Sequence, residues 1–364
     1  MSILVTEKKL RDFVEAVFLT YNLTKEEAFV CSDNLVMADM RGVHSHGVAR
    51  LKRYVDSIAQ GLIFPLKKPT VVLETPNTAT IDGNAGLGQI VGYHSTKIAI
   101  EKAKKTGIGV VTVRNSNHYG IAGYYANMML QEKLLGISMT NSAPLVVPTF
   151  GKEMMLGTNP ISLAAPTKRN RPFFLDMATS VVPRGKLEVY NREGKTMPDG
   201  WCVDEKGKAC SDPAKVLNNM SNRIGGGILP LGGEGELFSG YKGYGLALIV
   251  DILCGVLSGG AYSDLVYGEG KEGKGEPPNV GHFFMALKIE NFVDFDTFTS
   301  KMDDLLDRIK KSAKAEGENR IYIHGEKEYE KVEKYQKEGI PLQEKVYETL
   351  QNIAKERKLD FSLR

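Results

Sequence analysis

The strongest constraint on the fold is the order in which helical and extended patterns follow one another along the chain. Apolar residues recur at helical spacing near both ends, for example over residues 24–40, 48–61 and 342–358. Short runs rich in β-branched residues, typical of strands, fill the middle. Strand and helix do not alternate regularly, as they would in a doubly wound parallel sheet. We therefore predict an α+β protein in which helices from both ends form a unit around a central mixed β-sheet.

The remaining elements follow from the same patterns. A capping box at Thr24 and Glu27 marks the start of the first of these helices. Strands are predicted at residues 70–74, 78–82, 107–114, 135–142, 160–165, 173–177 and 280–289. Further helices are predicted from residue 86, through residues 124–130 and over residues 295–313. Residues 190–240 should be mostly loop, and residues 264–280 have the composition of a linker.

Composition argues against several classes of protein. The net charge is only +3, and no dense Lys/Arg stripe is present, so no nucleic-acid partner is expected. The most apolar run, residues 243–257, is interrupted by Asp251 and by glycines, which favours a buried core helix over a membrane span. The N-terminus does not resemble a signal peptide. The four cysteines form no C-x-x-C pair, which is typical of a reducing compartment, so we expect a cytoplasmic protein without a membrane partner.

The common nucleotide-binding fingerprints do not fit this chain. The glycines at 86, 88 and 92 have the wrong spacing for G-x-G-x-x-G. Residues 268–274 match part of a phosphate loop, but prolines follow where a helix would have to begin. A dinucleotide, if one binds, must therefore be held by another arrangement.

The stretch RGVHSHGVAR at residues 41–50 offers the clearest candidate for chemistry. It holds two of the six histidines, framed by glycines between two predicted helices. An imidazole ordinarily titrates near neutral pH, so His46 could donate a proton. Ser45 could orient that ring, and the guanidinium of Arg50 could hold a substrate carboxylate by two parallel hydrogen bonds. These residues predict an enzyme that protonates a small carboxylic acid.

Two other interpretations remain open from the residues alone. His44, His46, His118 and Asp176 could be the ligands of a metal-dependent hydrolase, although H-x-H alone is a weak signal. The chain could also be a non-catalytic dinucleotide-binding or structural protein.

Five motifs in a fixed order give the chain a resemblance to a known family. They are RGVHSHGVAR at 41–50, RNSNHYG at 114–120, GTNP at 157–160, LDMATS at 175–180 and KGYG at 242–245. Together they span nearly the whole chain and resemble the malate/L-lactate dehydrogenase family of the second type. That family also contains sulfolactate, ureidoglycolate and diketogulonate oxidoreductases.

The resemblance implies a homodimer with a non-Rossmann fold that binds NAD or NADP in an extended form. It makes His46 the proton donor in carbonyl reduction and Arg50 the carboxylate anchor. In some members, a histidine matching His118 is the acid/base instead. Ser45, Thr158 and Asn159 lie in motifs that we assign to substrate binding, and no role is given to His44.

The resemblance also implies which residues line the cofactor. The residues expected there are His118, Ser142, Asp176, Met177, Ala178, Lys242, Glu316 and Glu318. Asp176 is in addition a candidate catalytic residue, because a carboxylate near His46 would raise the pKa of the imidazole and fix its tautomer. A cationic imidazole would then stabilise the charge that hydride addition leaves on the keto oxygen.

The expected function is thus NAD(P)-dependent interconversion of a small 2-hydroxy acid and its 2-keto acid, with malate first and lactate or sulfolactate next. We divide the chain into three parts. Residues 1–75 form the helical part with the histidine loop, and residues 76–292 form the mixed-sheet domain that binds cofactor and substrate. Residues 293–364 supply C-terminal helices that pack back on the first part.

Overall fold

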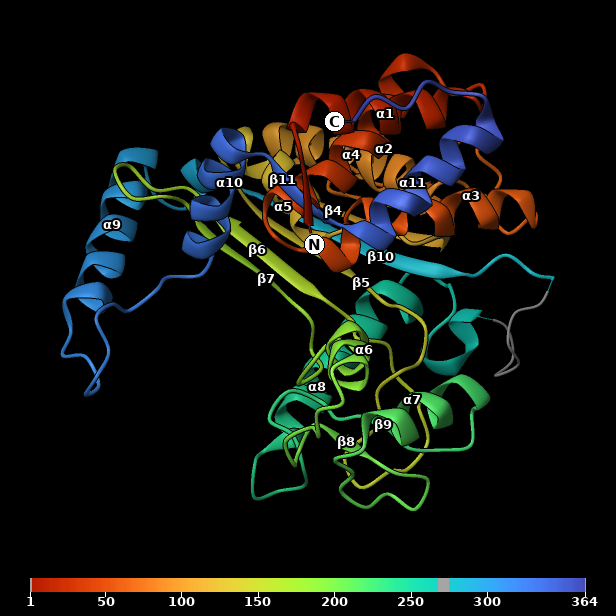
Figure 1. Ribbon diagram of the computed structural model, residues 1–364. Helices are drawn as coiled ribbons and strands as arrows, with labels where there is room; N and C mark the ends of the chain where they lie inside the picture. The colour runs from red at the N-terminus through yellow and green to blue at the C-terminus, as the bar shows by residue number, and fades with distance from the viewer. Residues whose placement is uncertain (1, 268–274, 364) are drawn as a thin grey trace.

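A seven-stranded sheet forms the centre of the computed structural model, which describes residues 2–267 and 275–363 (Figure 1). The strand order is β2-β3-β4-β10-β5-β6-β7. The strands are β2 (Thr70–Glu74), β3 (Thr78–Asp82), β4 (Ile108–Ser116), β5 (Leu134–Thr140), β6 (Ile161–Ala165), β7 (Phe173–Met177) and β10 (Val280–Lys288). β3 and β4 are parallel, and every other neighbouring pair is antiparallel. The predicted mixed sheet is confirmed.

The position of β10 determines where the sheet presents its polar residues. β10 pairs antiparallel with β4 on one side and with β5 on the other, so β4 and β5 run in the same direction. Their carboxyl ends therefore lie at one edge of the sheet. The segments that follow them carry His118 and Ser142 to that edge, the usual place for a ligand in an open sheet.

Helices α4 (Gly88–Thr106) and α5 (Ala122–Gln131) pack against the sheet. Their apolar side chains form one core with the buried residues of β3, β4 and β10, such as Val111, Val113 and Phe284. Both helices start next to the segment that carries His118, so the same packing fixes that segment.

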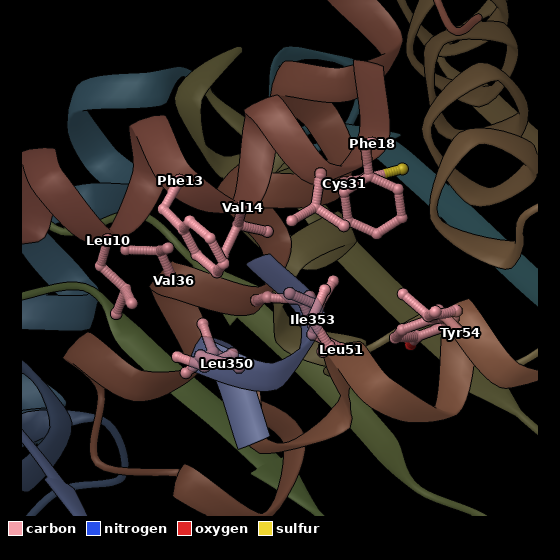
Figure 2. Close-up of a cluster of buried hydrophobic side chains, with 14 of the residues drawn as sticks. Leu10, Phe13, Val14, Phe18, Cys31, Val36, Leu51, Tyr54, Leu350 and Ile353 are labelled. Atoms are coloured by element: carbon pink, nitrogen blue, oxygen red, sulfur yellow. The ribbon is translucent and has the colours of Figure 1, made fainter. Parts of the chain in front are cut away.

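A second core joins the two ends of the chain. It involves α1 (Glu7–Leu19), α2 (Lys25–Met40), α3 (Leu51–Ala59) and α11 (Glu344–Arg357). Figure 2 shows its side chains meeting in one cluster: Leu10, Phe13, Val14 and Phe18 from α1, Cys31 and Val36 from α2, Leu51 and Tyr54 from α3, and Leu350 and Ile353 from α11. Strands β1 (Ser2–Val5) and β11 (Ile340–Gln343) also pair. The predicted helical unit built from both chain ends is confirmed.

Residues 190–240 are mostly turns and loop, as predicted, but they also contain α7 (Pro213–Asn222), strands β8 (Cys202–Val203) and β9 (Gly227–Ile228), and the end of α6 (Arg184–Arg192). Polar residues dominate the sequence of α7, so the pattern does not reveal its buried apolar face, which includes Val216 and Met220. The patterns also missed α1, the paired terminal strands and α10 (Glu326–Glu338).

The most apolar run of the chain is less buried than expected. It forms α8 (Gly240–Asp251) and a π-helical turn, η3 (Ile252–Val256). One face packs inward through Ala247, Val250 and Cys254, but Ile252 is 52% exposed and Leu257 is 56% exposed. The predicted core helix is therefore buried on one face only. None of the helices described is both long and apolar enough to span a membrane.

The remaining helix is α9 (Phe295–Lys311), which projects from the rest of the molecule beside β6 and β7 (Figure 1). The predicted linker at 264–280 lies partly outside the described residues, and so does the rejected phosphate-loop match at 268–274. The three-part division of the chain stays a prediction.

Candidate active site

The histidine loop leaves α2 through two short 3₁₀ turns, His44–His46 and Val48–Arg50. Asp39, which is 2% exposed, fixes both turns: its carboxylate accepts the backbone N–H of Val48 at 2.7 Å and lies 2.9 Å from Nδ1 of His44. A Cβ at Gly47 would lie only 2.1 Å from that carboxylate. Glycine is therefore required for the loop to close on Asp39.

The segment that follows β4 lies opposite the histidine loop and carries His118. The amide of Asn34 in α2 donates to the backbone carbonyl of Tyr119 at 3.1 Å and so ties this segment to the helical unit. Gly120 has a φ of +86°, and a Cβ there would lie 1.6 Å from Oδ1 of Asn34. This glycine allows the chain to turn into α5 while His118 stays at the edge of the sheet.

The histidine loop and the segment after β4 bring His46 and His118 together. Their rings stack with centroids 5.6 Å apart and planes inclined by 23°. Ser45 Oγ lies 3.0 Å from Nδ1 of His46, as expected for a side chain that orients the ring. Nδ1 of His118 lies 2.5 Å from the Tyr54 hydroxyl and accepts the backbone N–H of Gly120 at 3.3 Å. Because Nδ1 of His118 is an acceptor, its hydrogen must be on Nε2.

Both imidazoles are neutral at neutral pH in this environment. Burial, with further contributions from Arg50 and Arg53, lowers the pKa of His46 to about 4. Burial and the charge of Arg53 hold the pKa of His118 well below its usual value. The expectation that Asp176 raises the pKa of His46 is wrong, because the charges acting on His46 are the two arginines.

A cavity of about 130 Å³ opens beside the two rings; we call it the histidine cavity. Three arginines, Arg50, Arg53 and Arg184, line it, and among the described residues no carboxylate does. Nε of Arg50 donates to the carbonyl of Ser45 at 2.6 Å, which holds the guanidinium beside the histidine loop. The cavity therefore has the charge expected of a site for an anion.

The other predicted substrate residues divide into two groups. Ser45, Ser142 and Thr158 line the histidine cavity, and the Ser142 hydroxyl accepts the backbone N–H of Thr158 at 3.2 Å. Asn159 does not line it: its side chain is fully buried and donates to the carbonyl of Ala247 at 3.0 Å. The structure thus places Asn159 in the packing against α8.

A second cavity, of about 370 Å³, adjoins Ile121, which ends the short segment that carries His118; we call it the aspartate cavity. Asp176 and Met177 line it together with Arg41, whose guanidinium stacks over the Phe174 ring at 3.9 Å. Oδ2 of Asp176 accepts the backbone N–H of Gly123 at 2.8 Å. Desolvation by the surrounding protein raises the pKa of Asp176 to about 6, although this hydrogen bond and Arg41 act in the opposite direction.

Four predicted cofactor residues line neither cavity. Ala178 follows β7, and Lys242 is exposed on the first turn of α8. Glu316 and Glu318 are exposed in the loop between α9 and α10. Their contacts with a cofactor stay a prediction.

The positions of His44, His46, His118 and Asp176 do not support the metal-dependent hydrolase. His44 faces Asp39, His46 stacks on His118, and Asp176 lines the other cavity. Within residues 2–267 and 275–363, no three His, Cys, Asp or Glu side chains are grouped so that they could hold a metal ion.

Three residues of the site were missed by sequence reasoning. Arg53 lies three positions beyond Arg50, so helical spacing could have indicated it. Tyr54 lies at the helical spacing of the apolar residues over 48–61, which predicts burial alone, but the hydroxyl of a buried tyrosine needs a partner, and here it reaches His118. Arg41 gave no separate signal, because its partners Phe174 and Tyr329 are distant in the sequence.

The fold and the two cavities fit a dehydrogenase of small hydroxy acids that lacks the Rossmann topology. The chain belongs to the malate/L-lactate dehydrogenase family, whose model matches residues 5–351. The family predicted from the five motifs is confirmed.

Individual relatives cover almost the whole chain. A malate dehydrogenase of Pyrococcus horikoshii is 53% identical over 351 residues, which are 96% of this chain and 94% of that protein. An L-sulfolactate dehydrogenase of Methanocaldococcus jannaschii is 39% identical over 98% of this chain and 96% of its own length. The crystal structure of malate dehydrogenase from Entamoeba histolytica is similar with a TM-score of 0.94 at 37% identity, over 99% of both chains.

Proposed function

We propose that the chain is an NAD(P)-dependent oxidoreductase that interconverts malate and oxaloacetate, with lactate or sulfolactate as the next candidates. The observation that carries the proposal is the histidine cavity, where two stacked imidazoles adjoin three arginines and no carboxylate of the described residues lines the wall. The similarity to malate dehydrogenases supports malate as the first choice.

Arg50 is proposed to hold the carboxylate next to the keto carbon. Its Nε is engaged by the Ser45 carbonyl, whereas no bond from its two terminal nitrogens is seen among the described residues. A guanidinium fixed at one nitrogen and open at the others can bind a carboxylate through two hydrogen bonds. The carboxylate would then hold the keto oxygen beside the imidazoles.

His46 is proposed to deliver the proton. Among the described residues, only the Ser45 hydroxyl is bonded to its Nδ1. A hydroxyl can either donate or accept, so His46 can gain and lose a proton without breaking this contact. His118 is less free, because the N–H of Gly120 points at its Nδ1. We therefore propose that His118 offers its Nε2–H to the keto oxygen as a fixed donor.

Substrate binding should prepare His46 for this role. Arg50 and Arg53 lower the pKa of His46 in the free site. A bound carboxylate offsets their charge, so the pKa of His46 rises when the keto acid enters.

The residues present fit a nicotinamide dinucleotide, NAD or NADP, which supplies or accepts the hydride when bound. The two cavities are lined by consecutive parts of the same two segments: Ser45, His46 and residues 118–120 line the histidine cavity, whereas Arg41, Val43 and Ile121 line the aspartate cavity. An elongated ligand can therefore contact His118 and Ser142 in one cavity and Asp176 and Met177 in the other. The buried Arg41, whose Nη1 has no partner among the described residues, adds a cation beside the aspartate cavity.

A panel of 2-keto acids with NADH and NADPH tests the proposal. Loss of nicotinamide absorbance should be fastest with oxaloacetate, and the better cofactor identifies the dinucleotide. If no 2-keto acid is reduced with either cofactor, the proposed function is wrong.

A homodimer is also proposed, and the exposed apolar face of α8 and η3 supports it. The face comprises Leu248, Ile249, Ile252, Val256 and Leu257, which are at least 36% exposed. Such a contiguous apolar face is typical of a protein–protein contact. Light scattering should give twice the mass of the chain, and Ile252→Glu should reduce it. A wild-type protein with the mass of one chain would contradict the homodimer. The cytoplasmic location stays a prediction.

A further inference from the structure

Arg50 and Arg53 approach the histidine cavity from the same helical segment. They lie three positions apart where the 3₁₀ turn Val48–Arg50 runs into α3, and side chains at this spacing lie on one side of a helix. Both line the histidine cavity. Arg50 has the larger effect of the two on the pKa of His46, whereas Arg53 has the larger effect on that of His118. Each cation thus adjoins one of the two stacked rings.

Arg53 has no acidic partner among the described residues. Its Nη2 donates to the hydroxyl of Tyr267 at 2.8 Å, a neutral group, and no carboxylate within residues 2–267 and 275–363 pairs with the positive charge. Glu276 lines a smaller pocket of about 70 Å³ that Arg53 also borders, but forms no ion pair with it. Arg184, the third arginine of the cavity, is already engaged by Glu188 at 3.1 Å.

A substrate with a single carboxylate, held by Arg50, would leave Arg53 without a counter-charge in the cavity. A second anionic group at the far end of the substrate would provide one. We propose that Arg53 binds the distal anionic group of a four-carbon keto dicarboxylate and so makes the site selective for dianionic over monoanionic 2-keto acids. Tyr267 is a positioning residue that holds Arg53 toward the cavity. This inference rests on the proposed function, since it concerns the substrate of the same site.

The kinetic test compares oxaloacetate with pyruvate, which share the keto acid group but differ in the distal carboxylate. Arg53→Gln should lower kcat/KM for oxaloacetate by roughly 30-fold or more, as for loss of one partner of a charge pair, and change that for pyruvate by less than about 3-fold. Tyr267→Phe should give a smaller loss with the same substrate preference. Lys52→Gln is the matched control, because Lys52 is exposed and pairs with Asp56 one turn along the helix. Retained activity on pyruvate shows that Arg53→Gln is folded.

A binding measurement separates this inference from the proposed function. L-malate and L-lactate are titrated calorimetrically into the protein with NADH, where no reaction can occur. Wild type should bind L-malate more tightly, and Arg53→Gln should lose that preference. If wild type reduces no 2-keto acid, the proposed function fails, and the titration still decides the role of Arg53. Equal losses on oxaloacetate and pyruvate, or an undiminished preference for L-malate in Arg53→Gln, would overturn the inference.

Discussion

The histidine cavity and the aspartate cavity adjoin the same segment, from His118 to Ile121, yet they differ in charge. Arginines line the first, and no described carboxylate does. The second combines Arg41 and Lys327 with Asp176 and Glu328, so its charges are mixed. A small anion fits the first environment, whereas a larger ligand with both polar and charged parts fits the second. We therefore infer that the histidine cavity binds the substrate and transfers the proton, whereas the aspartate cavity binds part of the cofactor.

The largest effect should come from His46. His46→Asn removes the proposed proton donor and should lower turnover by roughly 10²–10⁴-fold, the usual range for a positioned acid. Cofactor affinity should hardly change, because His46 does not line the aspartate cavity. Steady-state kinetics of His46→Asn and His118→Asn, measured side by side, check this. Near-normal turnover in His46→Asn together with loss of activity in His118→Asn would reverse the two roles.

Arg50→Lys should have the next largest effect. Lysine keeps the charge but lacks the fork that binds a carboxylate through two parallel hydrogen bonds. We expect kcat/KM for oxaloacetate to fall by an amount equivalent to about 2–4 kcal/mol, with the KM for NADH nearly unchanged. An arginine that merely faces solvent would change kcat/KM by less than about 0.5 kcal/mol, and such a result would remove the carboxylate anchor.

The pH profile of malate oxidation should reveal the lowered pKa of His46. His46 must be neutral to accept a proton from malate, and its pKa in the free protein is about 4. The kcat/KM for malate oxidation should therefore stay flat on acidification until the pH approaches that value. Arg50 lowers this pKa, so Arg50→Gln should move the acid limb to higher pH. A wild-type limb near the ordinary histidine value, 6.5, would contradict the electrostatics described here.

The sequence predicted the histidine cavity better than the aspartate cavity. Local spacing was sufficient for Ser45, His46 and Arg50, because one short loop carries all three. The separation of Asp176 from His46 could not be predicted, because it depends on how β7 and the segment from His118 to Ile121 are placed in the sheet. The role of Tyr54 could not be predicted for a similar reason. Its helical spacing predicts burial, but its contact with His118 joins residues 64 positions apart.

At the level of the fold, the apolar strands and several periodic helices were predictable, whereas α1, α10 and the short strands were not. β1 and β11 pair with each other from opposite ends of the chain, so neither strand can be recognised from its local sequence alone. The exposed face of α8 could not be predicted, because an apolar run has the same sequence pattern whether its helix is fully buried or has one exposed face.

Asp176→Asn tests the division of roles between the two cavities. Asparagine keeps an oxygen that can accept the N–H of Gly123, so the change removes the charge and leaves this contact possible. The measurement is the affinity for NADH, followed by nicotinamide fluorescence, together with the KM for oxaloacetate, in Asp176→Asn and Arg50→Lys. Asp176→Asn should weaken NADH binding and leave the KM for oxaloacetate nearly unchanged, whereas Arg50→Lys should do the reverse. Unchanged NADH affinity in Asp176→Asn with a fall in turnover like that of His46→Asn would contradict the division, because Asp176 would then act with His46.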